Sequence, residues 1–168
     1  MNSSICIIIL KTFLLPIVEF GTLLQYLVPS GLLQKGQKIW NRGLRLAFRK
    51  PDARYSNIQL YEKGKILPLN LRREKSLLKL MFSLSKDQSR HANLARRTRY
   101  NTGVILKQFK PKTKIMLDSP FYIGPKIWNQ LPNEIRKAGT IEEFDRLLDK
   151  MYWRDLRVLN GIIQPNPE

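Results

Sequence analysis

The chain has almost none of the residues from which metal sites and disulfides are built. Its 168 residues include one cysteine, Cys6, and one histidine, His91. A structural zinc site takes four ligands, mostly from these two residue types, so none can be assembled here. Cys6 stands in an apolar run, which is typical of a buried thiol. A lone free thiol fits a reducing compartment, and we therefore expect an intracellular protein, nuclear or cytoplasmic.

Paired carboxylates are also missing. The six aspartates stand in unlike contexts, and the one adjacent acidic pair, Glu142-Glu143, is placed where a helix starts. Two-metal phosphoryl transfer needs carboxylates that converge on the ions. The sequence also lacks a Gly-Lys-Ser or Gly-Lys-Thr phosphate loop and a Gly-x-Ser-x-Gly turn. We expect no catalytic residue, no bound metal and no cofactor, so the chain on its own is not an enzyme.

Negative charge is scarce and unevenly placed. Lys and Arg number 30 against 13 Asp and Glu, which gives a net charge of +17. Residues 31–117 hold 22 of the basic residues and four acidic ones, a local net charge of +18. Such a field favours a polyanionic partner, because each neutralised phosphate releases condensed counterions. We expect RNA or DNA as the partner and keep, as the alternatives, an ordinary solvated surface or a face that docks on an acidic neighbouring domain.

Long apolar runs are limited to residues 5–28. The start of the chain lacks the basic residues of a signal peptide. Lys11 and Glu19 would each cost about 2.5 to 3.5 kcal/mol at the centre of a bilayer, and Pro16 interrupts the run. The pattern favours one or two buried helices and no membrane partner. A membrane anchor over residues 5–28 is the alternative.

The segment 32–48 has the periodicity of an amphipathic helix. One side is apolar and carries Leu33, Trp40, Leu44, Ala47 and Phe48. The opposite side is predicted to be wholly cationic, because basic residues recur there at spacings of three and four with no carboxylate before Asp52: Lys35, Lys38, Arg42, Arg45 and Arg49. Gly36 and Gly43 are expected to permit close approach of another element. This helix is the predicted principal contact with nucleic acid.

A second helix is predicted over residues 70–85. Its apolar face carries Leu77, Met81 and Leu84, and its opposite face repeats the basic stripe with Arg72, Lys75 and Lys79. The following polar segment adds three candidate nucleic-acid contacts, Arg96, Arg97 and Arg99. The pattern also allows a short β-hairpin near residues 104–117, between 104–109 and 113–117.

The end of the chain has clear helix signals. Pro132 suits the first turn of a short helix, and Gly139 suits its end. Thr140 and Glu143 form a capping-box pattern before an apolar face that starts at Ile141. The predicted fold is mainly α, as one compact unit with three segments: helices over 1–86, a basic loop over 87–122 and a helical tail over 123–168.

The run Gly-Pro-Lys-Ile-Trp-Asn-Gln-Leu-Pro, residues 124–132, resembles the C-terminal segment of reverse transcriptases of non-LTR (LINE-like) retrotransposons of the jockey type. The resembled positions are Gly124, Pro125, Trp128, Asn129, Leu131 and Pro132, with Phe144 in a closing helix. Further likeness lies in 10–21, in Gln37, Leu44 and Arg45, in Ile66-Leu67-Pro68-Leu69 and in Thr98-Arg99. Phe20 stands where the family has Tyr, and the family's following Trp is replaced by Leu24 or a neighbour.

The resemblance covers about residues 10–153. It implies the thumb and tail region that follows the catalytic palm of an RNA-directed DNA polymerase. Independently of the resemblance, Trp128 is interpreted as a core anchor, because a tryptophan has this role far more often than it stacks on a base. The rest of such a polymerase is then a further expected partner. A domesticated basic nucleic-acid-binding or interaction protein is the alternative.

Overall fold

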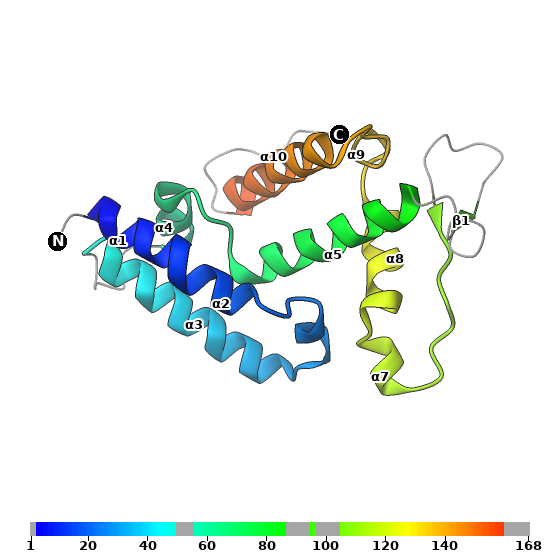
Figure 1. Ribbon diagram of the computed structural model, residues 1–168, viewed down its shortest axis with the longest axis horizontal. Helices are drawn as coiled ribbons and strands as arrows, with labels where there is room; N and C mark the ends of the chain where they lie inside the picture. The colour runs from blue at the N-terminus through cyan, green and yellow to red at the C-terminus, as the bar shows by residue number, and fades with distance from the viewer. Residues whose placement is uncertain (1–2, 50–55, 87–94, 97–104, 160–168) are drawn as a thin grey trace. The chain divides into compact units, whose positions relative to one another are not determined.

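A computed structural model describes residues 3–49, 56–86, 95–96 and 105–159, and these are mainly helical, as predicted (Figure 1). The chain groups into two compact units. The first comprises Met1–Arg73 and Asp155–Glu168, and the second comprises Glu74–Arg154. The division falls inside two long helices, α5 (Leu69–Lys86) and α10 (Ile141–Leu159), and not in the predicted basic loop.

The first unit begins with a helical run in three parts: α1 (Ser3–Ile9), a π-helical turn (Leu10–Leu14) and α2 (Leu15–Glu19). The amide N–H of Leu15 donates to the carbonyl of Leu10, five residues back. Pro16, which has no N–H to donate, follows directly within the first turn of α2. The wider turn therefore lets the helix pass the proline without a break. Gly21, with φ of 65°, then turns the chain toward a 3₁₀ segment, Leu24–Leu27.

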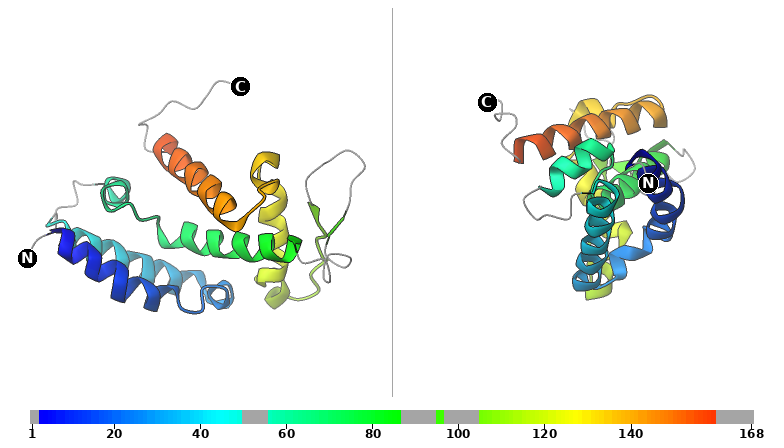
Figure 2. Two further views of the ribbon diagram at one scale, coloured as in Figure 1. Left: turned by 45° about the horizontal axis from the view of Figure 1, so that its top comes forward. Right: turned by 90° about the vertical axis from the view of Figure 1, so that its left-hand side faces the viewer.

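Helix α3 (Ser30–Ala47) lies beside this run, which confirms the helix predicted over residues 32–48 (Figure 1; Figure 2). Its buried side chains include Trp40 and Leu44. The close approach predicted at two glycines occurs at Gly43, where a Cβ would lie 3.7 Å from Leu10. It does not occur at Gly36, where a Cβ would meet no described atom within 4 Å.

The prediction of buried helices over residues 5–28 is wrong for the described structure. Leu15 is the one buried residue of this stretch, while Phe13, Ile17 and Phe20 are 67%, 71% and 87% exposed. Helix α1 of this run packs on α3, and Glu19 at the end of α2 pairs with Arg72, but these contacts leave the large side chains named above exposed. None of the described helices combines the length and the apolar character needed to cross a membrane.

Helix α4 (Asn57–Gly64) also belongs to the first unit and precedes α5. The hydroxyl of Ser56 accepts a hydrogen bond from the N–H of Ile58 and caps its start. Lys65, in a left-handed conformation with φ of 49°, ends it. Leu60 and Tyr61 of this helix are buried.

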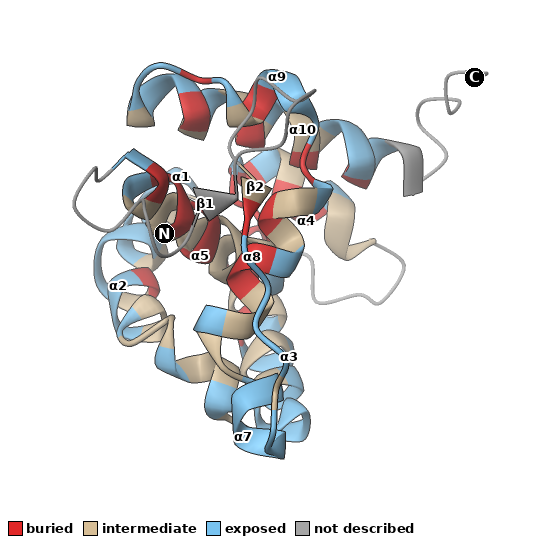
Figure 3. Ribbon diagram, turned by 90° about the vertical axis from the view of Figure 1, so that its right-hand side faces the viewer, coloured by how far each residue is buried: buried red, intermediate tan, exposed pale blue. Residues whose placement is uncertain are grey.

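The strands in the described part of the second unit are two short pieces. β1 (Ala95–Arg96) pairs antiparallel with β2 (Ile105–Leu106). The hairpin predicted between 104–109 and 113–117 does not form, because Lys114–Leu117 is a helical turn, α7. The hydroxyl of Thr113 accepts a hydrogen bond from the N–H of Met116 and so favours the turn over a strand. Figure 3 shows α7 as fully exposed.

The second unit is built around α8 (Pro120–Gln130), α9 (Asn133–Arg136) and the residues that it holds of α5 and α10. Figure 2 shows α8 beside the C-terminal part of α5. One half of the capping box predicted at the start of α10 is confirmed: Thr140 Oγ1 accepts from the N–H of Glu143. The Glu143 carboxylate reaches one residue further back than predicted and accepts from the N–H of Gly139. The core is a ring cluster of Phe82, Trp128 and Phe144, with the rings of Phe82 and Phe144 stacked 4.7 Å apart.

Candidate nucleic-acid interface

Three basic side chains of α3 form an open cationic face. Lys35, Lys38 and Arg42 are exposed, and none has a carboxylate partner among the described residues. They lie on the side of the helix opposite the buried Trp40 and Leu44, as their spacing predicted. Their ammonium and guanidinium groups are therefore free to bind an anion that approaches from solvent.

The other two predicted contacts of this stripe are placed differently. Arg45 is half-buried, and its Nη2 donates to the side-chain oxygen of Asn57 over 2.8 Å. Arg49 is exposed and follows the end of α3, with φ of 53°. Arg45 thus holds α3 to the start of α4, which reduces its freedom to follow a ligand.

The cationic face is not wholly cationic, in contrast to the prediction. Three apolar side chains of α3 recur every seven residues beside the basic ones, and they are more than half exposed: Leu32, Ile39 and Leu46. Ile39 is the most exposed of them, at 69%. The seven-residue spacing of these three side chains is visible in the sequence. It could have predicted a row of exposed apolar side chains along α3, because seven residues are close to two helical turns.

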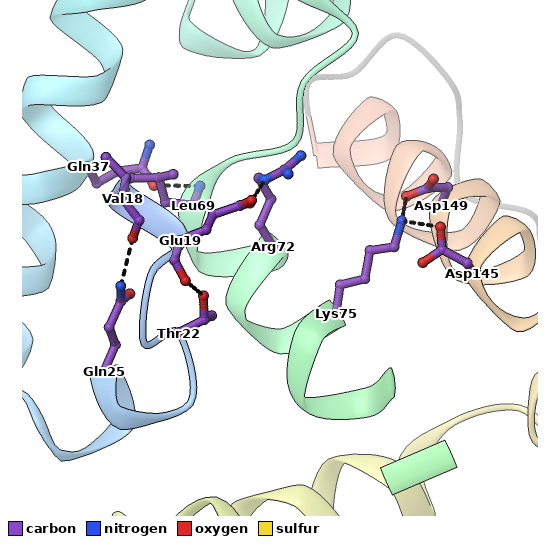
Figure 4. A network of polar contacts seen from close by, with 10 residues as sticks. All are labelled: Val18, Glu19, Thr22, Gln25, Gln37, Leu69, Arg72, Lys75, Asp145 and Asp149. Carbon is purple, nitrogen blue, oxygen red and sulfur yellow. Dashed lines mark hydrogen bonds and ion pairs between the residues drawn. The ribbon is translucent and has the colours of Figure 1, made fainter. Parts of the chain in front are cut away.

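The basic residues predicted as a second stripe, on α5, are matched by carboxylates. In the first unit Arg72 pairs with Glu19 (Figure 4). In the second unit Lys75 Nζ lies 3.1 Å from Asp145 and 2.7 Å from Asp149, and Lys79 Nζ lies 2.8 Å from Asp145. These ion pairs hold the three predicted cations of α5 against acidic side chains, so they are less open to a ligand than Lys35, Lys38 and Arg42 of α3.

Asp145 is the centre of this acidic cluster. Partial burial by itself would raise the pKa of Asp145, but hydrogen bonds from Lys79 and Lys75, together with their positive charges, outweigh it. The pKa of this carboxyl therefore lies below its usual value, and Asp145 is ionised at neutral pH.

The remaining predicted contacts are in the polar segment before α7. Arg96 belongs to β1, where the structure describes the backbone pairing with Ile105. Arg97 and Arg99 lie outside the described residues. Their part in binding stays a prediction.

Gln37 is at the centre of a hydrogen-bond cluster that the sequence did not indicate. Its Nε2 donates to Tyr61 Oη over 2.9 Å and to Asn41 Oδ1 over 2.8 Å, while its Oε1 accepts from the N–H of Leu69 over 2.9 Å. The Tyr61 hydroxyl also bonds to Asn41. Burial raises the pKa of Tyr61 to about 12, although the hydrogen bonds to Asn41 and Gln37 lower it. This cluster fixes α3 against α4 and the start of α5.

The residues of the 124–132 motif have structural roles. Trp128 is fully buried, which confirms it as a core anchor. Gly124 packs against Met81, where a Cβ would lie 2.7 Å from the sulfur atom. Asn129 exchanges two hydrogen bonds with the backbone of Leu106, over 3.0 and 2.9 Å, and so holds β2. Pro125 and Leu131 are buried, while Pro132 is exposed and caps α9. Because its side chain is fully buried, Trp128 offers no surface on which a base could stack.

The described residues contain no group of three His, Cys, Asp or Glu side chains that could hold a metal ion. Comparisons with known protein families, curated protein sequences and solved structures found no match. The resemblance to reverse transcriptases therefore stays a prediction.

Proposed function

We propose that this chain is a non-catalytic nucleic-acid-binding module that holds an RNA or DNA strand by its phosphates along α3. The observation that carries the proposal is the set of three exposed cations, Lys35, Lys38 and Arg42, which have no carboxylate partner among the described residues. They extend over about 10 Å of helix, at 1.5 Å per residue. Contacts of this kind bind the backbone without reading the bases.

In this proposal the chain is the post-catalytic C-terminal part of an RNA-directed DNA polymerase of a non-LTR retrotransposon. The support is the 124–132 motif together with the basic α3. The module would then grip template or target for an active site that lies elsewhere in the parent polymerase. A domesticated protein with the same α3 surface is the second candidate, since its backbone binding would be identical.

The test is a binding titration with a fluorescein-labelled single-stranded oligonucleotide, read by anisotropy. Changing Lys35, Lys38 and Arg42 together to Gln removes three phosphate contacts, and we expect affinity to fall by about tenfold or more at low salt. Because these side chains are exposed and opposite the core, helix content should not change.

The matched control removes the same charge elsewhere, by changing Lys126, Lys137 and Lys150 to Gln. These three lysines are exposed in the second unit. We expect a loss below about threefold, because mobile ions screen charges that make no contact. Equal losses in the two triple variants would reject α3 as the contact and leave its cations as a docking face for an acidic protein domain.

A further inference from the structure

The first unit contains a hollow of about 370 Å³ between the first half of α3, α4 and the start of α5. Its volume falls within the range of small-ligand sites, about 300 to 1,000 Å³. It is lined by Ser30, Leu33, Gln34, Gln37, Tyr61, Pro68, Asn70 and Arg73. Neither the sequence patterns nor the proposed backbone contacts assign it a role.

The polar groups in the wall of the hollow already have hydrogen-bond partners within the protein. Gln37 uses both ends of its amide within the protein, on Tyr61, Asn41 and Leu69 (Figure 4 shows its bond to Leu69). Tyr61 and Pro68 are buried and present apolar surface, together with Leu33. A planar apolar group could therefore enter without breaking a hydrogen bond.

The rim, in contrast, offers free polar groups. The side chains of Gln34 and Asn70 are exposed and have no hydrogen-bond partner among the described residues. Planar amides of this type match the donor and acceptor edges of nucleobases. They are placed on two helices, α3 and α5, so they can approach one ligand from two directions.

The charge at the hollow is positive, and none of the described carboxylates pairs with it. Arg73 is half-buried, and no described carboxylate pairs with it, although the neighbouring Arg72 is paired with Glu19. A guanidinium that lines a hollow without a partner favours an anionic ligand, phosphate above all.

We infer that this hollow takes one nucleotide of the bound strand. The base lies against Leu33, Pro68 and Tyr61, with its edge at Gln34 and Asn70, and its phosphate lies at Arg73. Lys38 stands one turn beyond Gln34 on α3, so the basic face continues from the rim. The inference rests on the proposed function and adds to it a site for a single base.

The test uses side-chain amide signals in NMR spectra of the full chain, titrated with AMP, UMP or inorganic phosphate. We expect saturable shifts of the Gln34, Gln37 and Asn70 amides with the mononucleotides, with dissociation constants near or tighter than about 1 mM. Inorganic phosphate alone should shift them less. Absence of saturable shifts at these three residues would overturn the inference.

Two variants assign the contacts. Arg73→Gln and Gln34→Leu should each weaken mononucleotide binding by about fivefold or more, the loss expected for one hydrogen bond to a charged or planar partner. The controls are Arg146→Gln and Gln59→Leu, which change exposed residues away from the hollow and should have no effect. Equal effects in variants and controls would also reject the site.

The outcomes separate this inference from the proposed function. The variant with Lys35, Lys38 and Arg42 changed to Gln should lose oligonucleotide affinity and keep the mononucleotide shifts. Oligonucleotide binding without those shifts would contradict the inference alone. Shifts without oligonucleotide binding would contradict the proposed function alone, and the loss of both in the unaltered chain would contradict both.

Discussion

Two residues of the 124–132 motif have contacts that few other side chains could make. Gly124 is buried where α8 meets α5, and its missing Cβ makes room for Met81. Asn129 uses its whole amide on the backbone of Leu106. These residues were singled out from sequence by resemblance, but their contacts lie 23 or more positions away and could not be derived from local pattern.

At this scale we predict that Gly124→Ala destabilises the chain by about 1 to 3 kcal/mol, because the added methyl group must displace the buried Met81 side chain. Urea unfolding followed by circular dichroism measures the change. Gly36→Ala is the matched control. It lies in α3 with no described atom within 4 Å, so it should stabilise by about 0.5 to 1 kcal/mol through helix propensity. A stable Gly124→Ala variant would show that Met81 repacks freely.

At the scale of elements, the periodicity of apolar residues was sufficient to predict the regular helices. The apolar spacing predicted α3 and α5 within two residues of their observed ends, and the Thr140–Glu143 pair predicted the start of α10. Helix α8 was not predicted as a separate element: most of it lies in the predicted helical tail over residues 123–168, but Gly124 and Pro125 are local signals against a helix. The burial of Trp128 against Phe82 and Phe144 overrides them. Such a tertiary contact is not readable from the segment itself.

The carboxylates of α10 that hold Lys75 and Lys79 give a prediction at this scale. The pKa of Asp145 is lowered in the folded state, so its contribution to stability is present above the ordinary aspartate value, about 3.9, and is lost as pH falls through the lower folded pKa. Asp145→Asn should therefore reduce the free energy of unfolding at pH 7, and the difference should shrink below about pH 4.

Urea unfolding at a series of pH values checks this expectation. Asp118→Asn is the control, since Asp118 is exposed and has no ion pair among the described residues. A deficit in Asp145→Asn that stayed constant from pH 7 to pH 3 would mean that its packing, and not its charge, holds α10.

For the whole molecule, the distribution of net charge identified the basic region of the sequence. It did not show which cations of that region pair with carboxylates and which remain exposed to solvent. The excess over residues 31–117 includes Lys75, which the fold pairs with Asp145 and Asp149, 70 and 74 positions later. Lys35, Lys38 and Arg42 of α3, which carry the proposed function, are exposed and have no carboxylate partner among the described residues. Likewise, the apolar run over residues 5–28 looked like a core, yet most of its large side chains are exposed. Both outcomes depend on which segments the fold brings together, and a local sequence pattern does not contain that information.

The most direct test of phosphate binding along α3 is the salt dependence of affinity for a single-stranded oligonucleotide. With about three phosphates engaged, the logarithm of affinity should fall against the logarithm of salt with a slope of about −2, and of about −2.7 on duplex DNA. In the variant with Lys35, Lys38 and Arg42 changed to Gln, the slope on single strands should become shallower by about two units. A slope near zero in the unaltered chain, or an unchanged slope in the variant, would contradict the proposal that α3 binds the nucleic-acid backbone.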